Sequence, residues 1–247
     1  MPALLRLADG VLSVVLAPPC AACGTPLSQP TRGPVCQECW DSIARFAPPL
    51  CNHCGDPLLS WRENSDGDGR CARCRQQSSP VTASRAIGPY DGTLRAILHA
   101  FKYGGCRSLS RGLGELLRES AAEIIAGVDL AVPVPLHRSR HRARGFNQAR
   151  ELAKHLGVPL ADALRRTRAT ASQTDLPAEA RHGNVRGAFA LRRWMSRVNV
   201  EGLRVVLVDD VSTTGATIEA CAMVLRAAGA ADVSAVTAAR VVSRPRE

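Results

Sequence analysis

Hydrophobic residues from position 85 onward follow two alternating spacings, one typical of strands and one typical of helices. Short apolar stretches predict strands at residues 86–90, 128–134, 158–160, 203–208 and 232–242. Apolar residues at helical spacing predict helices at residues 93–103, 109–126, 147–156 and 216–228. Strands that alternate with helices indicate a parallel α/β sheet, because each helix returns the chain to the same end of the sheet.

The first 17 residues carry apolar side chains on one helical face, with Leu4, Ala8 and Val11 among them. We expect a short amphipathic helix at 1–17 that packs on the protein, with contact to a membrane surface as the lesser alternative. The apolar stretch is too short to span a bilayer, and Asp9 interrupts it. It also lacks the strongly basic start and the cleavage site of a signal peptide, so we expect a cytoplasmic chain.

Residues 18–75 have a different composition, because they are rich in Cys, Pro and Gly and have few long apolar runs. Such a segment does not build a large core and needs an additional stabilising link, such as a bound metal or a disulfide. Within it, residues 60–70 predict an exposed loop, and residues 76–84 after it predict a linker. The expected organisation is an N-terminal helix, a cysteine module at 18–75 and an α/β domain at 85–247.

Eight of the ten cysteines occur as four C-x-x-C pairs. The first two pairs are separated by twelve residues, and the last two are separated by sixteen. At this spacing two thiolates meet one metal ion, so two pairs close a structural Zn(Cys)₄ site, and we expect about two zinc ions per chain. The expected ligands are Cys20, Cys23, Cys36, Cys39, Cys51, Cys54, Cys71 and Cys74.

Two questions about these cysteines stay open in the sequence. Pairing in chain order makes two adjacent zinc ribbons, whereas an interleaved pairing uses the same ligands in another combination. Disulfides are the alternative to zinc, but a reducing compartment disfavours them. A C-x-x-C redox site is also disfavoured, because four pairs are more than such a site uses.

The chain is basic, with a net charge of +10, and lysine occurs only at Lys102 and Lys154. The other cations are arginines, whose planar fork grips phosphate oxygens at two points. This composition favours phosphorylated ligands or nucleic acid, with an ordinary solvated surface as the alternative. Hydrophobic residues make up 45% of the chain, which is enough for a sizeable core and argues against wholesale disorder.

The most informative segment is VVLVDDVSTTGAT at residues 205–217. We expect a buried strand to end in two adjacent carboxylates, Asp209 and Asp210, and a hydroxyl-rich turn to open a helix. Free N–H groups at a helix start favour a phosphate, and carboxylates accept hydrogen bonds from a sugar diol. Capping of a turn explains one aspartate there better than two. The sequence has no Walker-type or dinucleotide-type glycine motif, so those nucleotide folds lose support.

A basic segment lies between the strand expected at 128–134 and the helix expected at 147–156. Five of its seven residues are basic, namely Arg138, Arg140, His141, Arg142 and Arg144. We expect a loop here whose guanidinium groups neutralise the charge of a pyrophosphate group. The same groups suit a nucleic-acid backbone, and a solvated, mobile loop is the third interpretation.

Residues 205–217 resemble the phosphoribosyl pyrophosphate (PRPP) signature of type I phosphoribosyltransferases. By that resemblance, Asp209 and Asp210 hold the ribose hydroxyls and are the expected catalytic carboxylates. The residues expected around the 5′-phosphate are Ser212, Thr213, Thr214, Gly215 and Thr217. The basic segment takes the place of the pyrophosphate loop, with His137 and Arg144 as the expected contacts.

Further motifs resemble the ComF family over nearly the whole chain. Besides the cysteine module, they are Tyr90-Asp-Gly92, Phe101-Lys-Tyr-Gly104, Pro133-Val-Pro-Leu-His137, Arg144-Gly-Phe-Asn-Gln148, Arg166-Thr-Arg168, Gln173, Arg181 and Asn184-Val-Arg-Gly-Ala-Phe189. The resemblance implies a type I phosphoribosyltransferase-like parallel sheet flanked by helices, behind a small N-terminal double zinc ribbon. Members of this family are linked to natural competence and to the handling of imported single-stranded DNA.

Two hypotheses about function follow. In the first, an enzyme moves the ribosyl-5-phosphate of PRPP, bound with Mg²⁺, to a nitrogen nucleophile in DNA uptake, competence or nucleotide salvage. In the second, the chain is a non-catalytic single-stranded DNA-binding factor or a PRPP-sensing regulator, with competence or DNA-processing proteins as partners. We find no acceptor-recognition element in the sequence, and a zinc module that covers the active site is a further hypothesis.

Overall fold

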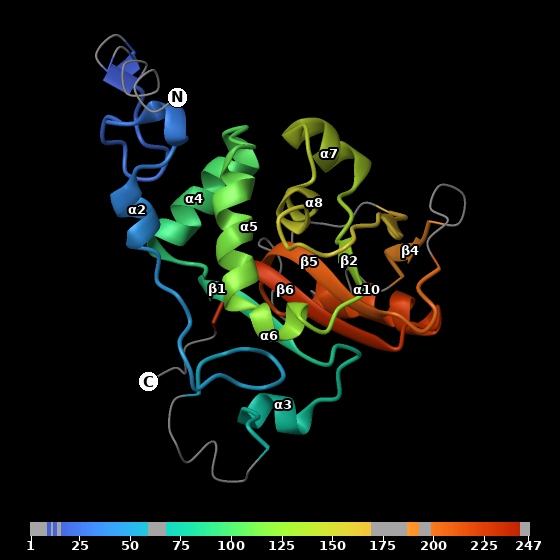
Figure 1. Cartoon of the computed structure of the whole chain (residues 1–247). Coiled ribbons are helices and arrows are strands. Elements are labelled where there is room, and N and C mark those ends of the chain that lie inside the picture. Colours follow the sequence, from blue (N-terminus) through green and yellow to red (C-terminus); the bar gives the residue numbers. More distant parts are fainter. Residues whose placement is uncertain are drawn as a thin grey trace.

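A parallel sheet of four strands forms the centre of the structure (Figure 1). In the order β1-β6-β5-β2, its strands are Ser84–Pro89, Asp232–Arg240, Arg204–Ser212 and Leu130–Pro133. Every neighbouring pair of strands is parallel. A separate antiparallel pair joins β3 (Leu164–Arg166) to β4 (Phe189–Leu191). The parallel α/β fold expected from the alternating pattern is confirmed.

This computed structural model describes residues 9–10, 12–13, 16–58, 68–168, 187–192 and 199–242 of the chain. The helix expected at 1–17 and the loop expected at 60–70 lie largely outside these residues. The family motifs at Gln173 and Arg181, and the first half of the motif at 184–189, lie outside them as well. Among the described helices, none is both long enough and apolar enough to cross a lipid bilayer.

Helices cover both faces of the sheet (Figure 1). One face carries α4 (Gly92–Tyr103), α5 (Leu109–Ser120), α6 (Ala122–Ile125) and α8 (Gln148–Ala153), and the other carries α10 (Ala216–Ala227). Val206 and Val208 of β5 face the first layer, whereas Val205 and Leu207 face α10. Because both faces are buried, this strand has an almost continuous apolar run instead of alternation. The single helix expected at 109–126 is divided into α5 and α6.

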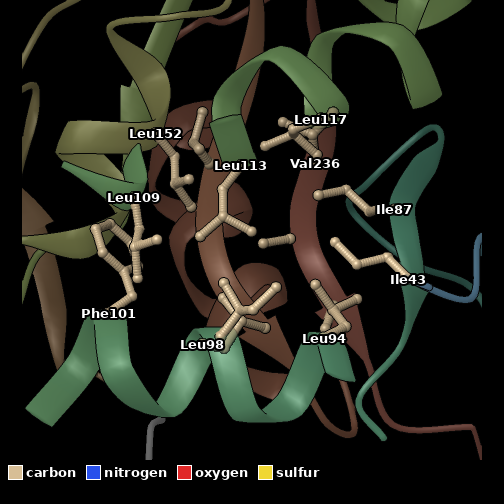
Figure 2. Packing of buried hydrophobic residues seen from close by; sticks show 14 of the residues in the cluster. Ile43, Ile87, Leu94, Leu98, Phe101, Leu109, Leu113, Leu117, Leu152 and Val236 are labelled. Atoms are coloured by element: carbon tan, nitrogen blue, oxygen red, sulfur yellow. The ribbon is translucent and has the colours of Figure 1, made fainter. Parts of the chain in front are cut away.

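Figure 2 shows how α4 and α5 pack on the sheet. Leu94 and Leu98 of α4 and Leu113 and Leu117 of α5 are almost completely buried, in one cluster with Val236 of β6. Burial of each such side chain stabilises the fold by roughly 1.5–3 kcal/mol. This layer therefore holds α4 firmly, and with it the residues at the end of α4 that reach the carboxyl end of β5.

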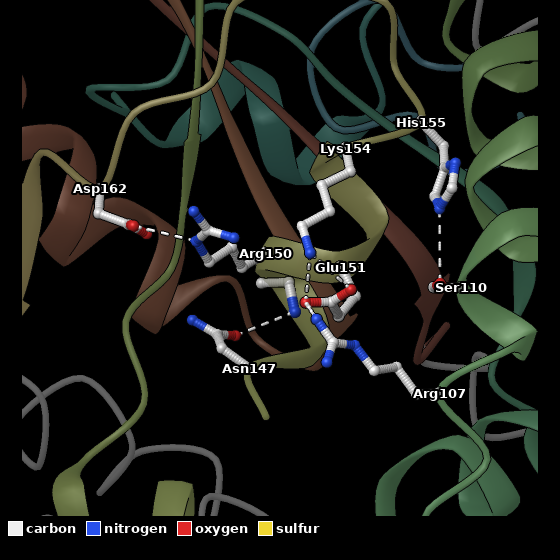
Figure 3. A network of polar contacts seen from close by, with 9 residues as sticks. Arg107, Ser110, Asn147, Arg150, Glu151, Lys154, His155 and Asp162 are labelled. Atoms are coloured by element: carbon white, nitrogen blue, oxygen red, sulfur yellow. Dashed lines mark hydrogen bonds and ion pairs between the residues drawn. The ribbon is translucent and has the colours of Figure 1, made fainter. Parts of the chain in front are cut away.

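Polar contacts anchor α8 (Figure 3). Asn147 caps its first turn, and its side-chain amide donates a hydrogen bond of 3.0 Å to the carbonyl oxygen of Val134, just after β2. The buried carboxylate of Glu151 pairs with Arg107 at 2.7 Å and with Lys154 at 2.8 Å. Burial raises the pKa of Glu151, but the two cations outweigh it, so this pKa lies below its ordinary value.

β5 is longer than the sequence predicts. The apolar run predicts an end at residue 208, but the pairing of β5 with β6 continues as far as Ser212, which lies opposite Arg240. Asp209 and Asp210 therefore lie inside the strand and not after it. Because successive side chains of a strand point to opposite faces, the two carboxylates have different neighbours.

The basic segment expected as a loop is a short helix, α7 (Arg138–Arg144). His137 caps its start, where Nδ1 accepts a hydrogen bond of 3.3 Å from the N–H of Ser139. Gly145 ends it at a φ of 77°, a left-handed conformation that glycine adopts without strain. Arginine is a good helix former, so a run of arginines between two capping residues favours a helix, and the loop prediction was wrong.

Short extended segments cover both edges of the sheet. On the β1 side, the N–H of Phe46 donates to the carbonyl oxygen of Ile87 at 2.9 Å. On the β2 side, the strand expected at 158–160 is reduced to a single bridge between Leu160 and Ala131. These segments occupy groups that would otherwise be free to pair with another chain.

Gly88 of β1 lies where the segment before Phe46 crosses the strand, and an added Cβ would overlap the carbonyl oxygen of Ala44. We expect Gly88→Ala to lower the free energy of unfolding by roughly 1–3 kcal/mol, measured by urea denaturation. Gly127→Ala is the matched control, because its Cβ meets nothing closer than 3.6 Å. Its expected change is within about 0.5 kcal/mol. Equal losses in both variants contradict the close approach.

Candidate functional site

The two cysteine modules have the same local structure, which begins at Cys20 in the first and at Cys51 in the second. In each module the N–H of the first cysteine donates to the carbonyl oxygen five residues later, at 2.7 Å in the first and 2.8 Å in the second. The third cysteine of each quartet precedes a short helix, α2 (Gln37–Asp41) or α3 (Ala72–Gln76). The first module also contains a 3-10 turn, η1 (Pro30–Arg32). The modules are therefore structural duplicates.

The sulfur atoms of each module lie at distances suited to one zinc ion. The Sγ–Sγ distances are 3.9 Å for Cys20–Cys39, 3.8 Å for Cys23–Cys36 and 3.8 Å for Cys54–Cys71. Zn–S bonds of about 2.3 Å place the sulfurs of a tetrahedral site about 3.8 Å apart. The clusters follow chain order, as Cys20, Cys23, Cys36 and Cys39, then Cys51, Cys54, Cys71 and Cys74. The two clusters are consistent with two structural zinc ions.

Replacing ligands in one module tests whether the clusters are independent. We expect Cys36→Ser with Cys39→Ser to lower the zinc content from about two ions per chain to about one, measured by metal analysis. Cys221→Ser is the control, because Cys221 is buried in α10 outside both clusters. Loss of both ions from the first variant contradicts two separate sites.

Asp209 and Asp210 lie at the carboxyl end of β5 and have different partners. The carboxylate of Asp210 faces α4 and α7, where Lys102 Nζ lies at 3.3 Å and the Arg144 guanidinium at 3.8 Å. These three side chains are mostly buried, with exposed fractions between 11% and 16%. The N–H of Asp210 donates to Oδ1 of Asp209 at 2.9 Å. Lys102 thus belongs to the site, although the sequence indicated it only as part of a family motif without a role.

Asp209 is the carboxyl group whose protonation the structure changes most clearly. Burial, and then the charge of Asp210, raise its pKa to about 7, although Lys102 and Arg166 act in the opposite direction. A carboxyl group that titrates near neutral pH, next to an ion-paired one, is typical of a functional site. Arg166 stacks over the ring of Phe189 at 5.2 Å, and burial lowers its pKa. The β3–β4 pair brings Arg166 here, a position that its family motif did not indicate.

The hydroxyl-rich turn stands at the start of α10. Gly215 is the N-cap residue, with a φ of 86° that favours glycine. Oγ1 of Thr214 accepts a hydrogen bond of 3.5 Å from the first helical N–H. Oγ of Ser212 is buried and has no hydrogen-bond partner among the described residues. Thr213 and Thr217 are partly exposed on either side of Gly215. The helix start therefore offers N–H donors and a buried hydroxyl to an anion.

The two residues expected to contact pyrophosphate stand at opposite ends of α7. Arg144, at its end, lies over the ring of Tyr103 at 5.2 Å as well as beside Asp210. His137, at its start, contacts Ser139 at 2.8 Å and caps the helix. The structure thus places Arg144 beside the carboxylate pair, whereas His137 caps the first turn of α7.

The raised pKa of Asp209 makes stability depend on pH. Between about pH 4 and 7 the folded state binds more protons at this group than the unfolded state, so its contribution to stability falls as pH rises. Asparagine does not titrate, so the stability of Asp209→Asn should not fall in this way. When the pH is raised from 5 to 8, we expect the difference in unfolding free energy between the variant and the wild type to shift by roughly 1–2 kcal/mol in favour of the variant, after allowance for solvent screening. Denaturant unfolding at both pH values measures this gain.

Asp129→Asn is the matched control at the opposite end of β5. The hydrogen bonds from Arg204 hold the pKa of Asp129 below its ordinary value, so this contribution is present at neutral pH and is lost in acid. The control therefore gains nothing relative to the wild type between pH 5 and pH 8. Parallel profiles for Asp209→Asn and the wild type contradict the assignment of the titrating group.

Comparison with known families finds two domain matches. A model described as a phosphoribosyl transferase domain matches residues 142–247, and a model described as a double zinc ribbon domain matches residues 11–75. The second range contains all eight cysteines of the two clusters, and the first contains the carboxylate pair and the hydroxyl-rich turn. Together with the parallel sheet, these matches confirm the expected phosphoribosyltransferase-like fold behind an N-terminal zinc-ribbon module.

Curated relatives match over most of their length. DNA utilization protein YhgH of Escherichia coli O157:H7 is 33% identical over 224 residues, which cover 87% of this chain and 93% of the relative. Competence protein F of Haemophilus influenzae is 30% identical, with 81% and 87% covered. Competence protein ComFC of Bacillus subtilis is 26% identical, with 83% and 84% covered.

A solved structure, described as the allosteric regulatory enzyme of purine biosynthesis, is 25% identical to this chain with a TM-score of 0.36. The match covers 57% of this chain and 30% of that one. This likeness is too partial to bear on function.

Proposed function

The chain belongs to the ComF/YhgH family, with a phosphoribosyl transferase domain and an N-terminal double zinc ribbon, and on this premise we propose that it binds PRPP at the carboxyl end of β5. The observation that supports this most directly is that the carboxylates of Asp209 and Asp210 are followed closely by the open start of α10. The carboxylates then accept hydrogen bonds from the ribose hydroxyls, and the neighbouring N–H groups donate to the phosphate of the same ligand.

Each part of PRPP has a proposed partner. Asp209 and Asp210 accept hydrogen bonds from the ribose hydroxyls. Arg144 exchanges its contact with Asp210 for the pyrophosphate, while Lys102 stays with the carboxylate. The Mg²⁺ that accompanies PRPP supplies further positive charge to the pyrophosphate oxygens when it is bound. The 5′-phosphate takes the N–H groups of the turn and the hydroxyls around Gly215, which belong to Ser212, Thr213, Thr214 and Thr217.

The proposed reaction is transfer of the ribosyl-5-phosphate group to a nitrogen. The lone pair of the nitrogen forms the new bond to C1 of the ribose, the C1–O bond breaks, and pyrophosphate leaves with the electron pair. The surplus proton on the nitrogen passes to solvent. Positive charge develops on the sugar in the transition state, and the carboxylate pair stabilises it, while Arg144 stabilises the leaving group.

The names of the relatives support a role in the use of DNA. They are a DNA utilization protein and two competence proteins, so we propose that this chain acts in DNA uptake or in salvage of its nucleotides. A second candidate is a single-stranded DNA-binding factor or a PRPP-sensing regulator without turnover. The observation that favours it is α7, where Arg138, His141 and Arg142 are exposed and suit a phosphate backbone.

We expect PRPP with Mg²⁺ to raise the thermal midpoint by about 5–10 °C at a hundredfold excess over its Kd. Asp209→Asn with Asp210→Asn removes the acceptors for the ribose hydroxyls, so the shift should disappear. Asp129→Asn, which changes a carboxylate at the other end of β5, should keep the full shift. A shift that persists in the double variant contradicts this site. Pyrophosphate release with a panel of nitrogen bases then separates turnover from binding alone.

A further inference from the structure

A cavity of about 420 Å³ lies between the second cysteine module and the start of α10. Ser212, Thr214 and Gly215 line it from the transferase side. His53, Arg73 and other polar residues of the second module line it from the opposite side. Its volume is in the range of small-ligand pockets, and it includes the turn to which the proposed function assigns the 5′-phosphate.

The transferase wall of this cavity carries a helix start and a buried hydroxyl, and the side chain of Glu219 lines the same wall. Gly215, the N-cap residue of α10, lines this wall, and Oγ1 of Thr214 accepts a hydrogen bond of 3.5 Å from the first helical N–H. Ser212 is only 4% exposed, and its Oγ has no hydrogen-bond partner among the described residues. A buried hydroxyl without a partner is costly, and a phosphate oxygen in the cavity would satisfy it.

The second module is seated directly on β1. The N–H of Ser84 donates to the carbonyl oxygen of His53 at 2.7 Å, and His53 Nδ1 lies 3.1 Å from the carbonyl oxygen of Thr82. At Gly55 an added Cβ would lie 2.5 Å from the carbonyl oxygen of Ser84. His53 and Gly55 flank the ligand Cys54, so the geometry of the metal cluster sets the position of this wall.

An ion pair connects the module to the phosphate turn. Asp56 pairs with the buried guanidinium of Arg240 and, at 3.1 Å, with Arg73. Arg240 lines the cavity and lies opposite Ser212 in the β5–β6 register. The next residue, Val241, donates its N–H to the carbonyl oxygen of Ser212 at 2.9 Å. Asp56 thus orients a cation beside the hydroxyl that faces the cavity.

The first module has a different neighbour. The ring of Trp40 lies against Gly112 of α5, where an added Cβ would come within 2.8 Å of it. The cavity beside that module is lined by its own residues and by α5. Of the two duplicated modules, the second is the one that borders the phosphate turn in the described part of the chain.

From this geometry we infer that the second zinc ribbon is a wall of the 5′-phosphate subsite, and that Arg240, oriented by Asp56, binds the phosphate of ribose 5-phosphates. This inference rests on the proposed function. It assigns the second ribbon a part in ligand binding and makes the affinity for a sugar phosphate depend on metal in that ribbon. Pyrophosphate, which binds beside Arg144, does not depend on it.

The test uses the full-length, zinc-loaded protein and measures the affinity for ribose 5-phosphate by titration calorimetry. Asp56→Asn with Arg240→Gln replaces both charges by amides and leaves every cysteine in place. We expect affinity to fall at least about tenfold, the effect of one charge-assisted contact, with about two zinc ions retained. Affinity for magnesium pyrophosphate should not change, which a merely misfolded variant would not show.

The matched control removes the ion pair between Arg45 and Glu119, which joins the segment after the first ribbon to α5 at 3.1 Å. Arg45→Gln with Glu119→Gln should bind ribose 5-phosphate like the wild type. A second variant, Ser78→Trp, fills the cavity from the exposed segment after the second ribbon and should also lower the affinity for ribose 5-phosphate.

A further experiment replaces zinc ligands in each ribbon separately and compares the effects on binding of ribose 5-phosphate. Cys51→Ser with Cys74→Ser should weaken binding of ribose 5-phosphate, whereas Cys36→Ser with Cys39→Ser should not. Wild-type affinity in both the Asp56–Arg240 variant and Ser78→Trp overturns the inference and leaves the proposed function standing. A wild-type protein that binds neither PRPP nor ribose 5-phosphate contradicts the proposed function itself.

Discussion

Two neighbouring carboxylates at the end of a buried strand are the constraint around which this site is arranged. Like charges so close together in a partly dry environment cannot both ionise without cationic partners. The strand separates them by pointing them to opposite faces, so that Asp210 meets Lys102 and Arg144, and Asp209 lies in the field of Arg166. Elements far apart in sequence, α4, α7 and β3, are therefore all required to complete one site.

Much of the fold was predictable because buried elements and metal sites require particular residue types at particular spacings in the sequence. Strands covered on both faces need uninterrupted apolar residues, so the sequence predicts β5. Metal ligands need fixed spacing, so the sequence also predicts the cysteine clusters. The end of β5 was misplaced because polar residues do not stop a strand whose neighbour still pairs with it, as Arg240 does with Ser212. The helix α7 was missed because charge alone does not distinguish a loop from a capped helix.

The candidate site was predictable only where its residues are contiguous. Asp209 and Asp210 and the turn after them form one segment, and a pattern of adjacent residue types identifies it. Lys102 and Arg166 reach the same place through tertiary packing, for which a single sequence has no local signal. The contact of His137 with pyrophosphate stays a prediction, and its described polar contacts lie at the start of α7, where it caps the helix.

The covered edge of β1 also has a consequence for the order in which the chain is made. β1 pairs with β6, which lies near the other end of the chain and leaves the ribosome much later. The segment around Phe46, whose N–H donates to Ile87 of β1 in the folded structure, is already synthesised when β1 emerges. It is therefore available to occupy this edge before β6 exists, which would leave fewer free backbone groups of β1 for pairing with other chains.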